Sequence, residues 1–287
     1  KLNKNFDDFF AKILLSIGYI LSFRTLRKKL GLQRAEFAAS GAAPIAPEVL
    51  KFFMSIGVPL FEAYGMTENC AYATSNSPEN IKIGTVGIPA HGVELKLADD
   101  GEILIRSGGV FKGYFKDDQA TSETIDKDGW LHTGDVGIYE GDFVKIIDRK
   151  RDIIITSGGK NVSPSEIENK IKVSPFIKEA IVIGDRRKFL SVLIGIEFDT
   201  VSNWALRKNI PHTTYRDLSE KQEVKDLVWK EISRANELTS SLEVREFRMI
   251  PKELDHEEGE LTATQKVKRN VLIDQFSDLI EEMYSWQ

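Results

Sequence analysis

Three kinds of hydrophobic pattern follow one another along this chain, and their order limits its fold more than any other feature. Within the first, residues 34–68, the run "RAEFAASGAAP" predicts a strand that enters a small-residue loop, and "VPLFEAYGMTE" predicts a second strand. Between them "APEVLKFFMSIG" predicts a helix, with Pro47 in its first turn and Gly57 as its stop. This succession is typical of an α/β layer, which binds ligands at the ends of its strands.

The pattern changes twice after this layer. From Ile81 to Ile147, short alternating runs such as "VELKLAD" and "EILIRS" lie between Gly- and Asp-containing turns, which predicts antiparallel strands in a small barrel or curled sheet. After Arg151 a helix, two strands and a long polar helix are predicted, with a last helix over 267–285. We therefore expect two domains, residues 1–150 and residues 151–287, of which the second is a small α+β lobe.

The two domains would join in "DRKRDIIITSGGKNVSP", residues 148–164. Three isoleucines stand there between a charge cluster and the pair Gly158 and Gly159. One interpretation is a short strand that enters a tight turn. The other is a hinge, followed by a loop along which a ligand must slide. The residues by themselves leave both interpretations open.

The first 31 residues are expected to form an amphipathic helix that ends at Gly31. Acidic residues precede its apolar run and Lys12 interrupts it, so the segment differs from a targeting signal, and the run is too short to span a bilayer. A helix that is buried or on the domain surface is favoured over peripheral contact with a membrane.

Charge and cysteine content exclude other classes of protein. The 287 residues carry a net charge of -5, and this lack of a basic excess predicts no nucleic-acid partner. The single cysteine, Cys70, rules out an internal disulfide framework and suits a reducing cytoplasm.

The motif "AYGMTE", residues 63–68, combines side chains that a nucleotide site needs. Tyr64 can stack on a base, Thr67 can donate to a phosphate oxygen, and Glu68 can hold Mg²⁺ against that phosphate. The motif is weak evidence by itself, because an aromatic residue near a turn and a capping Thr-Glu pair are both common.

Three further motifs each allow a structural and a functional interpretation. The small side chains of "SGAAP" (40–44) suit either a tight turn or a flat ligand against the backbone. In "GWLHTGD" (129–135), Asp135 either holds both ribose hydroxyls or belongs to a hairpin turn. In "GELTATQKVKRN" (259–270), Lys266 either reaches an anionic centre or belongs to a solvated basic stretch.

Taken together and in order, these motifs resemble the adenylate-forming superfamily, which includes acyl-CoA synthetases, luciferases and adenylation domains of peptide synthetases. The resemblance extends over nearly the whole chain from Phe37, and the variants "SGGKNVSP" and "LTATQKVKR" are most similar to AMP-forming long-chain fatty acyl-CoA synthetases. It implies the C-terminal part of a large α/β domain with a small β-barrel, followed by a small mobile α+β lobe.

The resemblance implies a role for each matching position. Thr67 would contact the α-phosphate of ATP, Glu68 would bind Mg²⁺, and Lys266 would stabilise the transition state for adenylation. Arg151 would be the pivot between the domains. The remaining positions would bind the nucleotide or line the path of coenzyme A: Gly41, Ala42, Ala43, Tyr64 and Gly65 around adenine, Asp135 and Arg149 at the ribose, Gly158 and Gly159 along the pantetheine arm.

The implied activity is a two-step ligation in which fatty acid and ATP give acyl-AMP and pyrophosphate, and CoA then displaces AMP. The phosphate-binding loop of such enzymes, rich in Ser, Thr and Gly and ending in Lys, has no counterpart here. The chain is therefore expected to be the C-terminal half of a longer enzyme, with the missing N-terminal part as its partner. Two alternatives stay open: an adenylation enzyme that loads a carrier protein, and a catalytically incomplete fragment that binds nucleotide or CoA.

Overall fold

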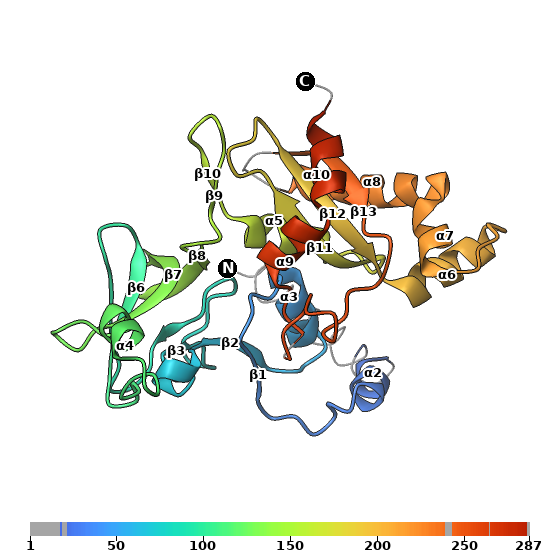
Figure 1. Ribbon diagram of the computed structural model, residues 1–287. Helices are drawn as coiled ribbons and strands as arrows, with labels where there is room; N and C mark the ends of the chain where they lie inside the picture. The colour runs from blue at the N-terminus through green and yellow to red at the C-terminus, as the bar shows by residue number, and fades with distance from the viewer. Residues whose placement is uncertain (1–17, 19–21, 239–242, 264, 286–287) are drawn as a thin grey trace, which may run out of the picture. The chain divides into compact units, whose positions relative to one another are not determined.

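The structure, a computed structural model, describes residues 18, 22–238, 243–263 and 265–285 (Figure 1). Internal contacts divide the chain into two units. The first unit holds residues up to 133 together with 137–146, and the second holds residues 134–136 together with 147–287. Each unit has its own buried clusters.

The first sheet of the first unit has the strand order β1-β2-β3-β4, and its first pair is parallel. Parallel neighbours need a crossover, which the helix α3 supplies, beginning with Pro47 and followed by Gly57 at a φ of 82°. This confirms the predicted strand, helix and strand, with shorter strands than expected. The bounds are β1 Ala38–Ser40, α3 Pro47–Ser55, β2 Leu60–Tyr64, β3 Thr74–Ser75 and β4 Ile88–Pro89.

The second sheet has the order β5-β6-β7-β8, with strands β5 Glu94–Leu97, β6 Glu102–Arg106, β7 Leu131–Glu140 and β8 Phe143–Arg149. Strand β7 contains the region for which a hairpin turn was one of the two interpretations. Leu131, Thr133 and Asp135 alternate toward the interior, so the chain passes through as a strand. Gly134 adopts a φ of 70° within it, which marks a local irregularity rather than a turn.

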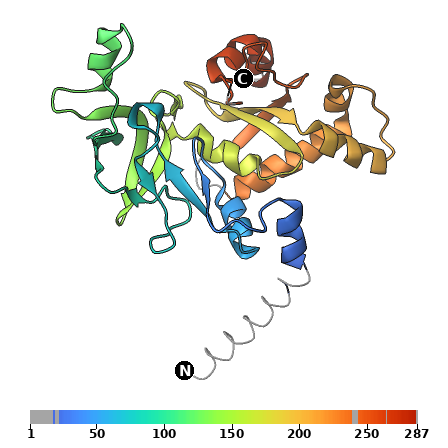
Figure 2. The same ribbon diagram turned by 90° about the horizontal axis from the view of Figure 1, so that it is seen from below.

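In the second unit a three-stranded sheet of order β11-β12-β13 is covered on both faces (Figure 2). Alternate residues of β11 face opposite sides of the sheet. Ala180 and Val182 pack with α5 (Pro164–Ile171) and α8 (Gln222–Glu237), whereas Ile181 and Ile183 pack with α9 (Arg269–Gln275) and α10 (Ser277–Tyr284). The central strand β12 is buried along its whole length. The bounds are β11 Ile177–Ile183, β12 Leu190–Ile196 and β13 Val244–Met249.

The helices of the described residues differ from the predicted pattern in several places. The segment 267–285, predicted as one helix, forms two helices that meet at Phe276, whose φ of -107° and ψ of 24° interrupt the first. Helices α4, α6 and α7 and strand β13 were not predicted. The bounds are α2 Arg24–Lys29, η2 Thr67–Asn69, α4 Asp118–Thr124, α5 Pro164–Ile171, α6 Phe198–Arg207, α7 Tyr215–Glu220, α8 Gln222–Glu237, α9 Arg269–Gln275 and α10 Ser277–Tyr284.

A buried carboxylate attaches the beginning of α5 to the end of β8. Asp148 is 6% exposed and accepts hydrogen bonds from the Ser163 hydroxyl at 2.7 Å and from the Ser165 hydroxyl and backbone N–H, each at 3.0 Å. The Ser163 oxygen also caps the helix by accepting from the backbone N–H of Glu166. These contacts all lie within the second unit.

The predicted helix over residues 1–31 falls mainly outside the described residues. Its end is described: α2 finishes at Lys29, and Gly31 follows with a φ of 73°, as a glycine after a helix commonly does. Among the described residues, no helix combines the length and the apolar character that crossing a membrane requires.

Candidate functional site

The ends of β1 and β2 bring two of the predicted motifs together. Because the strands are parallel and Ser40 pairs with Glu62, the small-residue loop 41–43 and the segment after Tyr64 leave the sheet at the same edge. The loop is exposed, and Ala42 adopts a φ of 68°. Tyr64 is 8% exposed, and its ring packs in a core cluster with Ile103, Leu131 and Val144.

Gly65 stands where the backbone folds back on itself. A Cβ atom added at this position would lie 2.3 Å from the carbonyl carbon of Ala71 and 2.6 Å from its Cα. The backbone N–H of Ala71 donates to Met66 at 2.8 Å, which closes the turn that contains η2. The absence of a side chain at Gly65 is therefore what allows Thr67 and Glu68 to stand at the end of β2.

Glu68 has a partner that the sequence did not indicate. The Tyr114 hydroxyl donates to Glu68 Oε1 at 2.9 Å, across 46 residues of sequence. Burial raises the pKa of the Tyr114 hydroxyl above its ordinary value, and the hydrogen bond to Glu68 raises it further. Thr67 is exposed and Glu68 is partly exposed, so both side chains can meet a ligand.

No group of three or more His, Cys, Asp or Glu side chains arranged to hold a metal occurs among the described residues. Glu68 offers a single, partly exposed carboxylate. Mg²⁺ in nucleotide sites is commonly bound by one or two carboxylates together with phosphate oxygens. The residues present therefore fit a magnesium ion that arrives with a nucleotide.

Glu62 is a second acidic residue at this edge that sequence reasoning missed. Its Oε2 atom is buried without a hydrogen-bond partner among the described residues. Burial raises its pKa to about 7, against a smaller opposing effect of a hydrogen bond from the Gly84 backbone. The sequence did contain a signal for this buried carboxylate, because Glu62 is a charged residue inside the otherwise uncharged strand "LFEAY".

In the second unit, Asp135 and Arg149 form an ion pair. Arg149 Nε lies 3.2 Å from Asp135 Oδ1, and the carboxylate side chain is 9% exposed whereas the guanidinium side chain is 46% exposed. Beside them Gly134, Arg149, Lys150 and Arg151 line a cavity of about 370 Å³. Three cationic side chains line this opening. Of these, Arg149 is paired with Asp135, and Arg151 Nε lies 4.0 Å from Asp152 Oδ1.

The two adjacent glycines lie at the tip of a hairpin. Strand β9, Ile154–Ile155, pairs with β10, Asn161–Val162, and Gly158 and Gly159 are exposed in the connection. Thr156, which is 5% exposed, closes the hairpin beneath the glycines. Its backbone N–H donates to the Lys160 carbonyl, and its hydroxyl accepts from the Lys160 N–H. Of the three isoleucines, two form this short strand. A Cβ at Gly159 would meet nothing within 4 Å.

Lys266 lies on an exposed loop that precedes α9. Its carbonyl accepts from the backbone N–H of Thr262 at 2.8 Å, and its own N–H donates to the Thr262 hydroxyl at 3.0 Å. A bridge between Leu261 and Val267 continues this pairing below the tip. The lysine is thus presented by a hydrogen-bonded hairpin rather than by an extended segment.

The predicted site residues divide between the two units. The first unit contains the loop 41–43 with Tyr64, Gly65, Thr67 and Glu68, which meet at one sheet edge. The second contains the ion pair of Asp135 and Arg149 and also Arg151, Gly158, Gly159 and Lys266.

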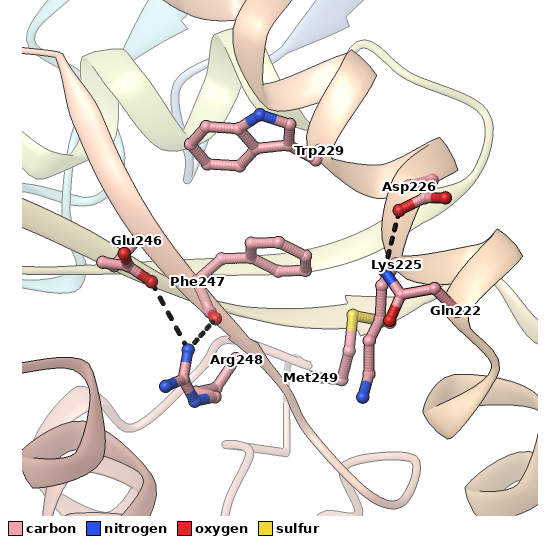
Figure 3. A pocket seen from close by; sticks show the side chains of 8 residues that line it. All are labelled: Gln222, Lys225, Asp226, Trp229, Glu246, Phe247, Arg248 and Met249. Atoms are coloured by element: carbon pink, nitrogen blue, oxygen red, sulfur yellow. Dashed lines mark hydrogen bonds and ion pairs between the residues drawn. The ribbon is translucent and has the colours of Figure 1, made fainter.

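A different cavity, of about 340 Å³, lies between α8 and β13 (Figure 3). The rings of Trp229 and Phe247 stack there with centroids 5.7 Å apart, and Trp229 is 38% exposed. Its lining is distinct from the predicted site residues and comprises Gln222, Lys225, Asp226, Trp229, Glu246, Phe247, Arg248 and Met249.

Solved structures identify the class of protein that this fold defines. The adenylation domain of a carboxylate reductase from Mycobacterium chelonae matches with a TM-score of 0.73 at 23% identity, over 94% of this chain and 42% of that one. O-succinylbenzoate coenzyme A synthetase from Bacillus subtilis, solved with AMP, matches with a TM-score of 0.60 at 26% identity, over 82% of this chain and 45% of that one. The fold is that of adenylate-forming enzymes, as predicted.

Sequence profiles narrow this class to a family. The profile described as AMP-binding enzyme matches residues 13–115, and the profile described as AMP-binding enzyme C-terminal domain matches residues 151–287. The chain belongs to the AMP-binding enzyme family, which confirms the resemblance.

Curated relatives extend beyond this chain. Long-chain-fatty-acid–CoA ligase FadD15 of Mycobacterium bovis is 37% identical over 268 residues, which are 92% of this chain and 44% of that protein. Long-chain-fatty-acid–CoA ligase ACSBG2 of Gallus gallus is 32% identical over 92% of this chain and 38% of its own length. The chain thus spans less than half the length of these relatives.

Proposed function

We propose that the complete protein is an AMP-forming long-chain fatty acid–CoA ligase. The observation that carries this proposal is the set of relatives named as such ligases, 32–37% identical across 92% of this chain. In the first step a fatty acid carboxylate attacks the α-phosphate of ATP, forming acyl-AMP and releasing pyrophosphate. In the second step the CoA thiol attacks the acyl carbon and AMP leaves, which forms acyl-CoA.

The edge formed by β1 and β2 would receive the nucleotide. An exposed loop without large side chains, Gly41 to Ala43, would let a flat base approach the backbone. Tyr64 would support this edge from the core in which its ring is buried. Thr67 would donate to the α-phosphate. Glu68 would hold Mg²⁺, which neutralises phosphate charge when it is bound.

The second unit would supply the ribose contact and the residues specific to each step. Asp135 is already oriented by Arg149 and can accept from two hydroxyls. Lys266 would neutralise charge that develops on the phosphate during adenylation. Gly158 and Gly159 would leave space for the pantetheine arm, since a side chain at the tip would occupy it.

The same proposal includes the domain organisation of the protein and its location in the cell. It has a large domain that ends near residue 150 and a small mobile domain over 151–287, with a pivot at Arg151. The rest of the large domain would supply the phosphate loop and the acyl tunnel. The protein would act in the cytoplasm, with any membrane contact peripheral and without a nucleic-acid partner.

Measuring the two half-reactions separately tests this function in the complete protein. Lys266→Ala should lower pyrophosphate exchange by about 100-fold, the usual loss when one charge-stabilising group is removed, and should spare thioester formation from supplied acyl-AMP. Gly158→Leu should do the reverse, because a side chain at this exposed tip, where a Cβ atom has no neighbour closer than 4.0 Å, would obstruct the CoA arm.

Two outcomes would contradict the proposal. If the parent protein exchanges no pyrophosphate with any fatty acid, it is not an adenylating enzyme. If the protein adenylates fatty acids but transfers the acyl group only to a phosphopantetheinylated carrier protein and never to free CoA, the proposal that CoA is the acyl acceptor is wrong. Both variants should melt within a few degrees of the parent, which confirms that each remains folded.

A further inference from the structure

One carboxylate in the second unit is completely buried at the base of the loop that carries Lys266. Glu260 is 0% exposed. Acidic side chains are seldom fully buried unless they are paired. Here Oε1 lies 2.7 Å from Lys252 Nζ, and Oε2 accepts from the backbone N–H of Asp255 at 2.8 Å.

These partners keep the carboxylate ionised. Burial by itself raises the pKa of Glu260, but interactions with the Lys252 ammonium group, the Asp255 backbone N–H and the Gln275 side chain outweigh it and hold the pKa below its ordinary value. The group therefore carries its charge at neutral pH, in a place where only a fixed set of donors stabilises that charge.

The backbone of Glu260 joins both sides of the loop. Its carbonyl accepts from the N–H of Lys268 at 2.8 Å, and its N–H donates to Asp255 at 3.2 Å. Lys268 is two residues after Lys266, so this bond closes the hairpin below the Leu261–Val267 bridge. The buried carboxylate and the closing bond therefore belong to the same residue.

The segment that leaves the loop is attached to the sheet through Arg269. Arg269 donates to the Val182 carbonyl at 2.9 Å and pairs with Glu168 at 2.5 Å. Glu168 in turn accepts from the N–H of Val182 at 2.8 Å. With the exit held on the sheet, the height and direction of the hairpin depend on how its base is held at Glu260.

We propose that Glu260 is a positioning residue for Lys266. Through its contacts with Lys252 and Asp255, Glu260 sets the orientation of the hairpin and so the place of the Lys266 ammonium group during adenylation. This inference rests on the function proposed above. A catalytic group that is misplaced by about 1 Å can lower the reaction rate by about 100-fold. A small tilt of the hairpin that carries Lys266 is therefore enough to slow adenylation.

The test uses Glu260→Gln and the matched control Glu258→Gln in the complete protein. Glu258 also pairs with Lys252, but its side chain is 60% exposed. We expect Glu260→Gln to lower kcat for pyrophosphate exchange by about 100-fold with little change in KM for ATP. The reason is that the substitution removes the charge that holds the lower end of the Lys266 hairpin in place. Thioester formation from supplied acyl-AMP should stay within about twofold in both variants.

A structural readout accompanies the rates. Amide hydrogen exchange at residues 262 and 266 should become faster in Glu260→Gln and stay unchanged in Glu258→Gln, since those two amides report whether the hairpin is closed. If Glu260→Gln does not fold, Lys252→Met, which removes the other half of the ion pair but keeps its packing, should give the same two results.

Three results separate the possible failures. Adenylation within twofold of the parent in Glu260→Gln would overturn the inference. Equal losses in both half-reactions would overturn it too, because they indicate general damage to the domain. If instead Lys266→Ala itself leaves adenylation intact, the proposed role of Lys266 fails, and the positioning role of Glu260 fails with it.

Discussion

At Gly65 the fold leaves space for a hydrogen atom only. A methyl group there would lie within 2.6 Å of the Ala71 backbone, which cannot move aside as a flexible side chain can. We predict that Gly65→Ala destabilises the protein by about 1–3 kcal/mol, the range for overpacking a close contact. Chemical denaturation monitored by intrinsic fluorescence measures the change.

Gly158→Ala is the matched control for this substitution. The nearest atom to a Cβ at Gly158 is 4.0 Å away, and the residue is exposed. Its free energy of unfolding should change by less than about 0.5 kcal/mol, as surface substitutions usually do. Equal effects of the two alanines would show that the turn after β2 tolerates a side chain.

Single candidate residues could be proposed from the sequence where a local motif offers suitable chemistry. Thr67, Asp135 and Lys266 could be selected because a hydroxyl, a carboxylate and a cation follow turn glycines or strand ends. The partners of such residues were not predictable. The contact between Glu68 and Tyr114 joins positions 46 residues apart, and the burial of Glu260 depends on a lysine and an amide that only the folded loop brings to it.

On the scale of elements, the attachment of α5 to β8 is the most concentrated set of polar contacts described. Asp148 accepts hydrogen bonds from two serine hydroxyls and a backbone N–H at the start of the helix. We predict that Asp148→Asn lowers stability by about 1.5–3 kcal/mol, because hydrogen bonds to a charged group are replaced by weaker neutral ones. Thermal unfolding of the purified protein measures the loss.

A carboxylate on the same helix provides the comparison. Glu166 pairs with Lys170 at 2.8 Å, but its side chain is 51% exposed. Glu166→Gln should cost no more than about 0.5 kcal/mol, as exposed pairs one helical turn apart do. If Asp148→Asn and Glu166→Gln unfold at the same temperature, the contacts of Asp148 contribute no more to stability than a surface ion pair does.

Elements with strong local signals were predicted, and those that depend on distant partners were not. Helix α3 has a proline at its start and a glycine after its end, so both limits could be read from the sequence. Strand β13 was missed because its sequence, "VREFRM", alternates weakly and becomes a strand through pairing with β12. The break between α9 and α10 at Phe276 was missed because no glycine or proline in this part of the sequence predicts the end of a helix.

For the whole molecule, the proposed function requires two working arrangements of the same two domains. Lys266 and Gly159 belong to one unit, yet they would serve different steps. A rotation about the segment around Arg151 would exchange them, and hinges of this kind are a common way of switching an enzyme.

Proline at the pivot should therefore separate the steps. We predict that Arg151→Pro lowers thioester formation by about tenfold or more while pyrophosphate exchange changes much less, because a fixed φ restricts the rotation. Arg151→Ala keeps the backbone free and should retain both activities. Parallel loss of both half-reactions in the proline variant would mean that the segment is a rigid connection.

The topology of the second unit has a consequence for its synthesis. Strands β11 and β12 are joined by the short segment 184–189 and can pair as soon as both have emerged, whereas β13 follows only after residues 197–243, and closing that longer loop is slower. Until β13 arrives, the edge of β12 is open, and every residue of that strand is one the finished lobe buries. An open apolar edge invites aggregation. The nascent chain is accordingly most in need of a chaperone between the emergence of residue 196 and that of residue 249.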